Sequence, residues 1–194
     1  MSSIAVLTND LQRDLVISRP EREAVVAAAT PAYVKFLEGI RERGHHVVHL
    51  QLILLPGDKH IEYVEGHPQA QEGTEGAAIL PEFLDERDVV VTKHKDSGFY
   101  ETDLHERLQE LGIETLIVTG MQTQICVQTT AADAFFRGYN VWVASDCVVS
   151  TREEDKKRAL DWMAGYCASV AESTEILALI DSGADMTSQV ARVP

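Results

Sequence analysis

The sequence predicts an α/β protein built on a doubly wound, six-stranded parallel sheet with helices on both faces. Short β-branched runs alternate with longer amphipathic segments along the chain, which is the pattern of a parallel sheet covered by helices. The length of 194 residues suits one domain with one sizeable core. A hydrophobic share of 45% and a charged share of 25% are ordinary for a globular protein.

Six short runs, most of them rich in valine, isoleucine and threonine, are the predicted strands. In chain order they are residues 4–8, 46–52, 88–92, 115–119, 140–145 and 168–171. Because they alternate strictly with helices, the sheet is expected to be doubly wound. Ligands of such sheets bind at the carboxyl ends of the strands, beside the topological switch point.

The segments between these runs carry the predicted helices. They are residues 31–43, 78–84, 101–111, a segment that follows GMQTQIC and runs through Arg137, 152–165 and 173–180. Gly44, Gly112 and Gly138 are expected to end three of them. Thr151 occupies the N-cap position of the fifth, whose acidic first turn suits the positive end of a helix.

Two stretches fall outside this alternation. Residues 55–76 are glycine-rich and acidic without a period, and so long a connection in a compact domain is usually a functional or a disordered loop. Residues 182–194 are predicted to form a C-terminal tail that frays or reaches a neighbouring subunit. The single domain is therefore expected to span residues 1–181.

The charge of the chain argues against two classes of partner. Lysine and arginine number 17 against 31 aspartates and glutamates, a formal net charge of -14, which repels phosphate backbones and anionic lipid headgroups. No apolar run approaches the roughly 18–20 residues of a membrane span. The first ten residues lack the basic and apolar regions of a secretory signal. We therefore expect a cytoplasmic protein with no nucleic-acid and no membrane partner.

The three cysteines are an odd and widely spaced set without a CxxC motif, so neither a disulfide framework nor a zinc knuckle is indicated. Cys126 lies at the turn between the fourth strand and the next helix, where backbone N–H groups and the helix dipole would lower the pKa of its thiol. The same N–H groups could hold an oxyanion. A buried structural thiol is the alternative for Cys126 and the prediction for Cys147 and Cys167.

Two other strand ends carry charged residues. Asp10 follows the first strand and Lys93 the third. Alternatively, Asp10 forms a turn, with Asp14 competing for its role, and Lys93 extends out of the sheet toward solvent. A carboxylate near a thiol can take its proton, and an ammonium group can orient the carboxylate. The chain has no GxGxxG and no GxxxxGK[ST], so no nucleotide phosphate cradle is predicted.

Several ordered segments resemble one family, the isochorismatase-like cysteine hydrolases. The segments are LTNDLQRDL, EGTEGAAILPEF, VVVTKHKDSGFYETDL and LIVTGMQTQICVQTTAADAFF. The family includes nicotinamidases, N-carbamoylsarcosine amidohydrolases and ureido-amide hydrolases. The resemblance covers nearly the whole chain and implies a Rossmann-like three-layer sandwich, and a homodimer or homotetramer.

The resemblance also implies site residues. Asp10 matches the family's general base, Lys93 its lysine and Cys126 its nucleophile; Gln12, Ser97 and Phe99 fall in register with the flanking motifs. A cis peptide is implied between Met121 and Gln122, with the N–H groups of Gln122 and Cys126 as an oxyanion hole. The candidate substrate contacts are Gln12, Leu15, Gln51, Phe99, Tyr100 and Met121, with His49, Tyr63 and His67 as further candidates.

No metal and no other cofactor is expected. The PGDKH string mimics the Asp-x-His pair with which nicotinamidases hold a metal, so Asp58, His60 and His67 are weak metal candidates. His67, however, lies closer to the pair than the family's third histidine does. The implied activity is metal-independent hydrolysis of a small carboxamide or ureido C–N bond through a thioester. The alternatives are vinyl ether hydrolysis of the isochorismatase type and a catalytically silent protein that binds a partner.

Overall fold

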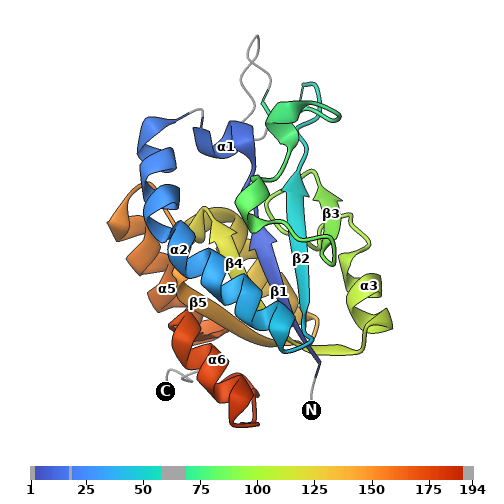
Figure 1. The fold of residues 1–194 in the computed structure, drawn as a ribbon, viewed down its shortest axis with the longest axis vertical. Coiled ribbons are helices and arrows are strands. Elements are labelled where there is room, and N and C mark those ends of the chain that lie inside the picture. Colours follow the sequence, from blue (N-terminus) through green and yellow to red (C-terminus); the bar gives the residue numbers. More distant parts are fainter. Residues whose placement is uncertain (1–2, 18, 58–68, 190–194) are drawn as a thin grey trace.

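The computed structural model describes residues 3–17, 19–57 and 69–189. Its six strands form one parallel sheet in the order β3-β2-β1-β4-β5-β6, which confirms the predicted fold class (Figure 1). The strands are β1 (Ser3–Asn9), β2 (His46–Leu52), β3 (Val89–Lys93), β4 (Ile113–Met121), β5 (Asn140–Val149) and β6 (Ser169–Ala171). The chain order reverses between β1 and β4, which is the switch point at which such sheets bind ligands.

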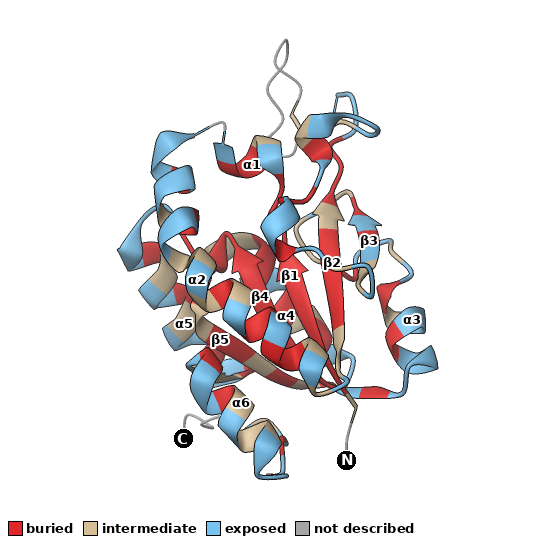
Figure 2. Cartoon of the chain, in the orientation of Figure 1, coloured by how far each residue is buried: buried red, intermediate tan, exposed pale blue. Residues whose placement is uncertain are grey.

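Helices cover both faces of the sheet. They are α1 (Arg13–Ile17), α2 (Pro20–Glu42), α3 (Leu104–Glu110), α4 (Gln128–Phe136), α5 (Glu153–Tyr166) and α6 (Ser173–Asp181), with a π-helix at Thr123–Val127 and 3-10 helices at Glu75–Ala77 and Pro81–Phe83. One hydrophobic cluster joins α1, α2 and α6 to the sheet, and the other joins α3, α4 and α5. The red strands of Figure 2 are buried between these layers.

Strand β1 shows why the predicted strands are short apolar runs in the sequence. Ile4 and Val6 point into the first cluster, whereas Ala5 and Leu7 point into the second. Because successive side chains alternate between faces and both faces are covered, residues 4–7 of the strand are all apolar.

Three helix predictions were wrong in detail. Helix α2 begins at Pro20 and carries Pro31 inside it, because the buried side chains of Val26 and Phe36 on either side hold the segment together. The helix expected at 78–84 is instead the short 3-10 turn that Pro81 opens. Thr151 does not cap α5, since Arg152 occupies the N-cap position without a side-chain bond.

The described part of the C-terminal tail packs against its own domain instead of fraying. The Met186 side chain is buried, and its carbonyl accepts a 2.9 Å hydrogen bond from the Trp142 indole on β5. The Gln189 amide donates to the Ser169 hydroxyl on β6 at 2.9 Å. Residues 182–189 therefore extend the domain along the edge of the sheet, beyond the limit at 181 that the sequence indicated.

Asp14 fastens the described part of the long mid-chain connection. Its carboxylate accepts a 2.8 Å hydrogen bond from the Ala70 amide, and a Cβ added at Gly76 would lie 2.0 Å from the same carboxylate. The Ala70 carbonyl in turn accepts from the Leu54 amide at 3.1 Å. Asp14 is thus a structural residue, which removes it as a competitor of Asp10.

Strand β4 approaches the backbone of β1 closely at Gly120. This glycine has a φ of +107°, and a Cβ there would lie 2.3 Å from the Asn9 backbone nitrogen and oxygen. The Tyr33 hydroxyl bonds both the Gly120 amide, at 2.9 Å, and the Gly120 carbonyl, at 3.0 Å. This contact fixes the strand ends between which the candidate site lies.

Replacing Gly120 by alanine is therefore expected to lower the free energy of unfolding by about 3 kcal/mol or more, from backbone strain plus the clash with Asn9. The control is Gly138→Ala, where φ is +87° but a Cβ would meet nothing within 4 Å, so strain alone should cost about 1 kcal/mol. Urea unfolding measures both. Equal losses would show that the close approach to Asn9 carries no weight.

Candidate active site

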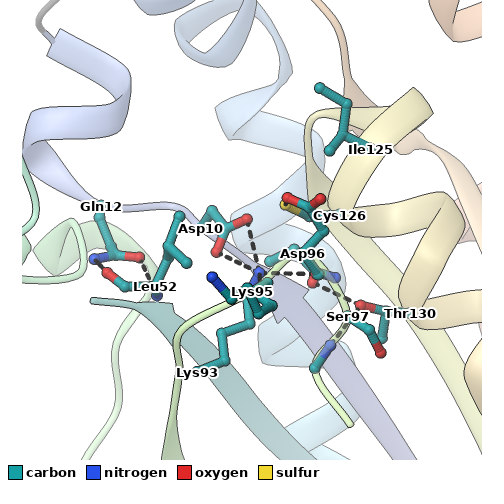
Figure 3. A network of polar contacts seen from close by, with 12 residues as sticks. Asp10, Gln12, Leu52, Lys93, Lys95, Asp96, Ser97, Ile125, Cys126 and Thr130 are labelled. Carbon is teal, nitrogen blue, oxygen red and sulfur yellow. Dashed lines mark hydrogen bonds and ion pairs between the residues drawn. The ribbon is translucent and has the colours of Figure 1, made fainter. Parts of the chain in front are cut away.

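Three side chains meet near the point where the strand order reverses. Asp10 directly follows β1, Lys93 is the last residue of β3, and Cys126 lies in the π-helix after β4. Figure 3 shows them close together at the carboxyl edge of the sheet. The structure thus gathers the three residues that the sequence singled out.

Asp10 and Lys93 form a buried ion pair. The Lys93 ammonium lies 3.0 Å from Asp10 Oδ1 and 3.1 Å from Oδ2. The exposed fraction is 0% for Lys93 and 3% for Asp10. Burial on its own would lower the pKa of Lys93, but the charge of Asp10, its hydrogen bond and the neighbouring Cys126 and Asp96 together outweigh burial, and the pKa lies above its ordinary value. The lysine therefore stays charged and holds the carboxylate in one orientation.

The Lys93 ammonium also shapes the turn that follows β3. It donates to the backbone carbonyls of Lys95, at 3.2 Å, and Asp96, at 3.0 Å. These bonds, with those to Asp10, supply hydrogen-bond partners for all three ammonium protons. One buried cation therefore positions both the carboxylate after β1 and the backbone after β3.

The Cys126 thiol faces two carboxylates. Its Sγ lies 3.6 Å from Oδ1 of Asp96, and the residue is 5% exposed. Burial, followed by the negative charge of Asp10, raises the pKa of the thiol well above its ordinary value, although Lys93 lowers it. The sequence-based expectation of a lowered pKa is wrong, because burial and the neighbouring carboxylates outweigh the helix start. The resting thiol is protonated and needs a base.

The implied cis peptide is present between Met121 and Gln122. The Gln122 side chain is tied to the turn after β5, where its Oε1 accepts from the Thr151 amide at 3.2 Å and its Nε2 donates to the Thr151 hydroxyl at 3.4 Å. The oxyanion hole formed by the N–H groups of Gln122 and Cys126 stays a prediction.

The family model for the isochorismatase domain matches residues 4–175. The chain belongs to the isochorismatase family. It is 33% identical to the uncharacterized isochorismatase family protein YddQ of Bacillus subtilis over 161 residues, which cover 78% of this chain and 82% of YddQ. It is 43% identical to YaaI of the same bacterium over 76 residues, 39% of this chain and 42% of YaaI.

Solved structures of the isochorismatase family share the fold. The crystal structure of N-carbamoylsarcosine amidase from Thermoplasma acidophilum is 28% identical in sequence and superimposes with a TM-score of 0.76, covering 88% of this chain and 96% of that one. The resemblance inferred from the sequence motifs is thereby confirmed at the level of the family and the fold.

Gln12 is a structural residue of this isochorismatase-family chain, not the substrate contact that the sequence suggested. The residue is fully buried. Its Nε2 donates to the carbonyls of Leu52, at 2.8 Å, and Ala77, at 2.9 Å, and its Oε1 accepts from the Leu52 amide at 2.7 Å. The amide thus ties the end of β2 to the mid-chain connection.

Other predicted contacts also receive structural roles. Leu15, Phe99 and Met121 are buried in the two hydrophobic clusters. Gln51 is half-buried and donates to the Ala77 carbonyl at 2.9 Å, while Tyr100 is 51% exposed. Periodicity places a residue on a strand or a loop, but it does not show what the side chain packs against, and a substrate contact by any of these residues stays a prediction.

His49 belongs to a buried polar chain away from the thiol. Its Nδ1 is 2.7 Å from the Thr8 hydroxyl and its Nε2 is 2.9 Å from Asp88 Oδ2, and Asp88 also pairs with Arg41 at 2.6 Å. The Thr8 hydroxyl and the Asp88 carboxylate satisfy both ring nitrogens of the histidine inside the fold.

The metal candidates Asp58, His60 and His67, like Tyr63, lie outside the described residues. Among the residues that the structure describes, no three His, Cys, Asp or Glu side chains are grouped as metal ligands would be. No helix in the same part of the chain is long and apolar enough to span a membrane.

Asp96 is the site residue that sequence reasoning missed. It lies within KHKDSGF, between the lysine and the serine of the recognised motif. The predicted site residues are those directly at the strand ends, whereas Asp96 lies in the turn that follows Lys93. His94, the first residue of that turn, has its ring Nδ1 2.8 Å from the Ile53 carbonyl.

Proposed function

We propose that this isochorismatase-family protein is a cysteine-dependent hydrolase that cleaves the C–N bond of a small carboxamide or ureide through a thioester. The observation that carries the proposal is a buried Cys126 thiol, whose pKa burial and Asp10 raise, beside an Asp10 carboxylate that lies 3.0 Å from the Lys93 ammonium. This is the arrangement that a nucleophile needs when it must be deprotonated by a neighbouring base. The similarity to an N-carbamoylsarcosine amidase supports a C–N bond as the target.

In the first half of the reaction, Asp10 accepts the Cys126 proton as Sγ attacks the carbonyl carbon. The S–C bond forms and the carbonyl electron pair moves onto oxygen, where the N–H groups of Gln122 and Cys126 receive it. The C–N bond then breaks as the oxyanion collapses, and the amine leaves with the proton from Asp10.

In the second half, water hydrolyses the thioester. Asp10 takes a proton from the water, whose oxygen attacks the carbonyl carbon, and the S–C bond breaks to release the acid. The proton held by Asp10 returns to the thiolate. Lys93 keeps Asp10 anionic and oriented between the two halves. The protein is proposed to need no cofactor for these steps and to act as a cytoplasmic homodimer or homotetramer.

The test is an ammonia-release screen over primary amides, ureides and hydroxamates, with the Cys126→Ala protein as the blank. A substrate found in this way should give an acyl adduct on Cys126 by intact mass after rapid quenching. Turnover without any dependence on Cys126 would contradict the proposal.

Vinyl ether hydrolysis is the second candidate, because the Asp10–Lys93 pair could protonate an ether substrate without a thiol. Isochorismate cleavage that survives Cys126→Ala would establish it. A silent binding protein would turn over neither substrate class.

Replacing Asp10 by asparagine is expected to have opposite effects on two measurements. Amide turnover should fall by about 10²–10⁴-fold, because the base is lost. Alkylation of Cys126 by iodoacetamide near pH 8 should become faster, since Asp10 is the charge that most raises the pKa of the thiol and Lys93 would then stabilise the thiolate. The pH profile of alkylation measures the shift, and slower alkylation in the variant would contradict it.

A further inference from the structure

A second carboxylate lies against the nucleophile. Asp96 Oδ1 is 3.6 Å from Cys126 Sγ, and Figure 3 shows the carboxylate beside the sulfur, with Asp10 at the other side of the Lys93 ammonium. The proton transfers proposed above use Asp10 alone. Asp96 is half-buried, so it is not part of the packed core.

The turn that carries Asp96 is fixed on two sides. The buried Lys93 ammonium holds its backbone carbonyl at 3.0 Å. On the other side, the Ser97 hydroxyl donates to Asp133 on α4 at 2.7 Å, and the Gly98 amide donates to the Thr130 hydroxyl at 3.0 Å. A turn held by both β3 and α4 places its side chain reproducibly next to the thiol.

This position constrains what can be attacked. A carbonyl carbon must come within about 3–3.5 Å of Sγ to react, and Asp96 Oδ1 is 3.6 Å from the same sulfur, so a group attached to that carbon can come within reach of the carboxylate. An ionised carboxylate accepts hydrogen bonds and donates none. Substituents that carry N–H groups or positive charge are therefore attracted, and a substituent that carries a carboxylate is repelled.

We propose that Asp96 is a specificity-determining residue that selects substrates presenting N–H donors or a cation beside the scissile bond and rejects those with a carboxylate there. The proposal rests on the proposed function, since it concerns the substrate of the same thiol. It points to unsubstituted amides, ureides and amides that also carry an amino group as the substrate class. It also makes isochorismate and other carboxylate-bearing compounds poor substrates.

A pair of alkylating reagents of nearly equal size tests this without knowledge of the substrate. Iodoacetamide is neutral and carries N–H donors, whereas iodoacetate is anionic. In both reactions the S–C bond forms, the C–I bond breaks, iodide leaves, and the thiol proton passes to Asp10 or to water. The ratio of the two rates at Cys126, followed by peptide mass and divided by the same ratio for 2-mercaptoethanol, reports selection by the site. Any change in thiol pKa cancels in this ratio.

The wild-type protein should favour iodoacetamide, and Asp96→Asn should reduce that preference by about five- to tenfold, as expected for one like charge near the reacting atoms. Asp96→Glu should keep most of the preference. Asp161→Asn on α5, an exposed aspartate paired with Lys157, makes the same change in net charge elsewhere and should leave the ratio unchanged. Asp96→Ser is a second neutral variant, and thermal unfolding checks that each protein is folded.

An unchanged ratio in both Asp96→Asn and Asp96→Ser would overturn the proposal, as would an equal change in Asp161→Asn. The amide screen separates this failure from failure of the proposed function. If the wild type hydrolyses amides while the ratio does not respond to Asp96, only the specificity proposal fails. If the ratio responds but no amide is hydrolysed, the hydrolytic function fails and the charge selection at the thiol stands.

Discussion

Replacing Cys126 by alanine is expected to reduce amide turnover by at least about 10³-fold, since removal of a covalent nucleophile leaves only the binding and oxyanion contributions. The fold should survive. Deleting one sulfur at the edge of the core costs about 1 kcal/mol, and the segment around it keeps its backbone bonds, including that from the Ile125 amide to the Gln122 carbonyl at 3.0 Å. Steady-state ammonia release and urea unfolding measure the two quantities.

Cys167→Ala is the matched control. This thiol is fully buried in the cluster beneath α5, and burial raises its pKa to about 11, but it lies at the end of a helix instead of after β4. Its loss should lower stability and leave turnover per folded molecule unchanged. A Cys126→Ala protein with near wild-type amide turnover would exclude the thioester route.

The fold could be predicted because a strand that is buried on both faces is a short run of consecutive apolar residues, which the sequence shows directly. Residues 4–7 of β1 are all apolar because both faces of the strand are buried, and this run can be recognised from the sequence alone. The start of α2 could not be predicted, since a helix that contains Pro31 persists only because of what its neighbours bury. The fate of the C-terminal tail likewise depends on Trp142, which is far away in sequence.

The candidate site, like the fold, could be predicted from the sequence only in part. Strand-end positions and motif resemblance predicted Asp10, Lys93 and Cys126. The direction of the thiol pKa shift depends first on burial, then on Asp10 and least on Asp96, and only the folded chain brings these together. Gln12 illustrates the converse error. A polar residue in a family motif suggested a substrate contact, yet backbone groups of Leu52 and Ala77 use its whole amide.

Replacing Lys93 by methionine should impair stability and catalysis together. The Asp10 carboxylate would lose the ammonium that lies 3.0 Å away, and removing one partner of a buried pair costs about 3–5 kcal/mol. At neutral pH the buried carboxylate is then driven to take up a proton, so it can no longer accept the one from Cys126. Turnover is expected to fall by about 10²–10⁴-fold. Urea unfolding and ammonia release at pH 7.5 measure both losses.

The stability loss should also depend on pH in a defined direction. Above about pH 4 an unfolded aspartate ionises, whereas Asp10 in the folded Lys93→Met protein retains its proton. The unfolded state therefore binds fewer protons, and the deficit relative to the wild type grows as the pH rises. The double variant Asp10→Asn/Lys93→Met has no charge to bury, so it should recover much of the stability and lose this pH dependence, yet remain inactive. Recovery of turnover in the double variant would instead mean that the pair serves folding alone and that another group deprotonates Cys126.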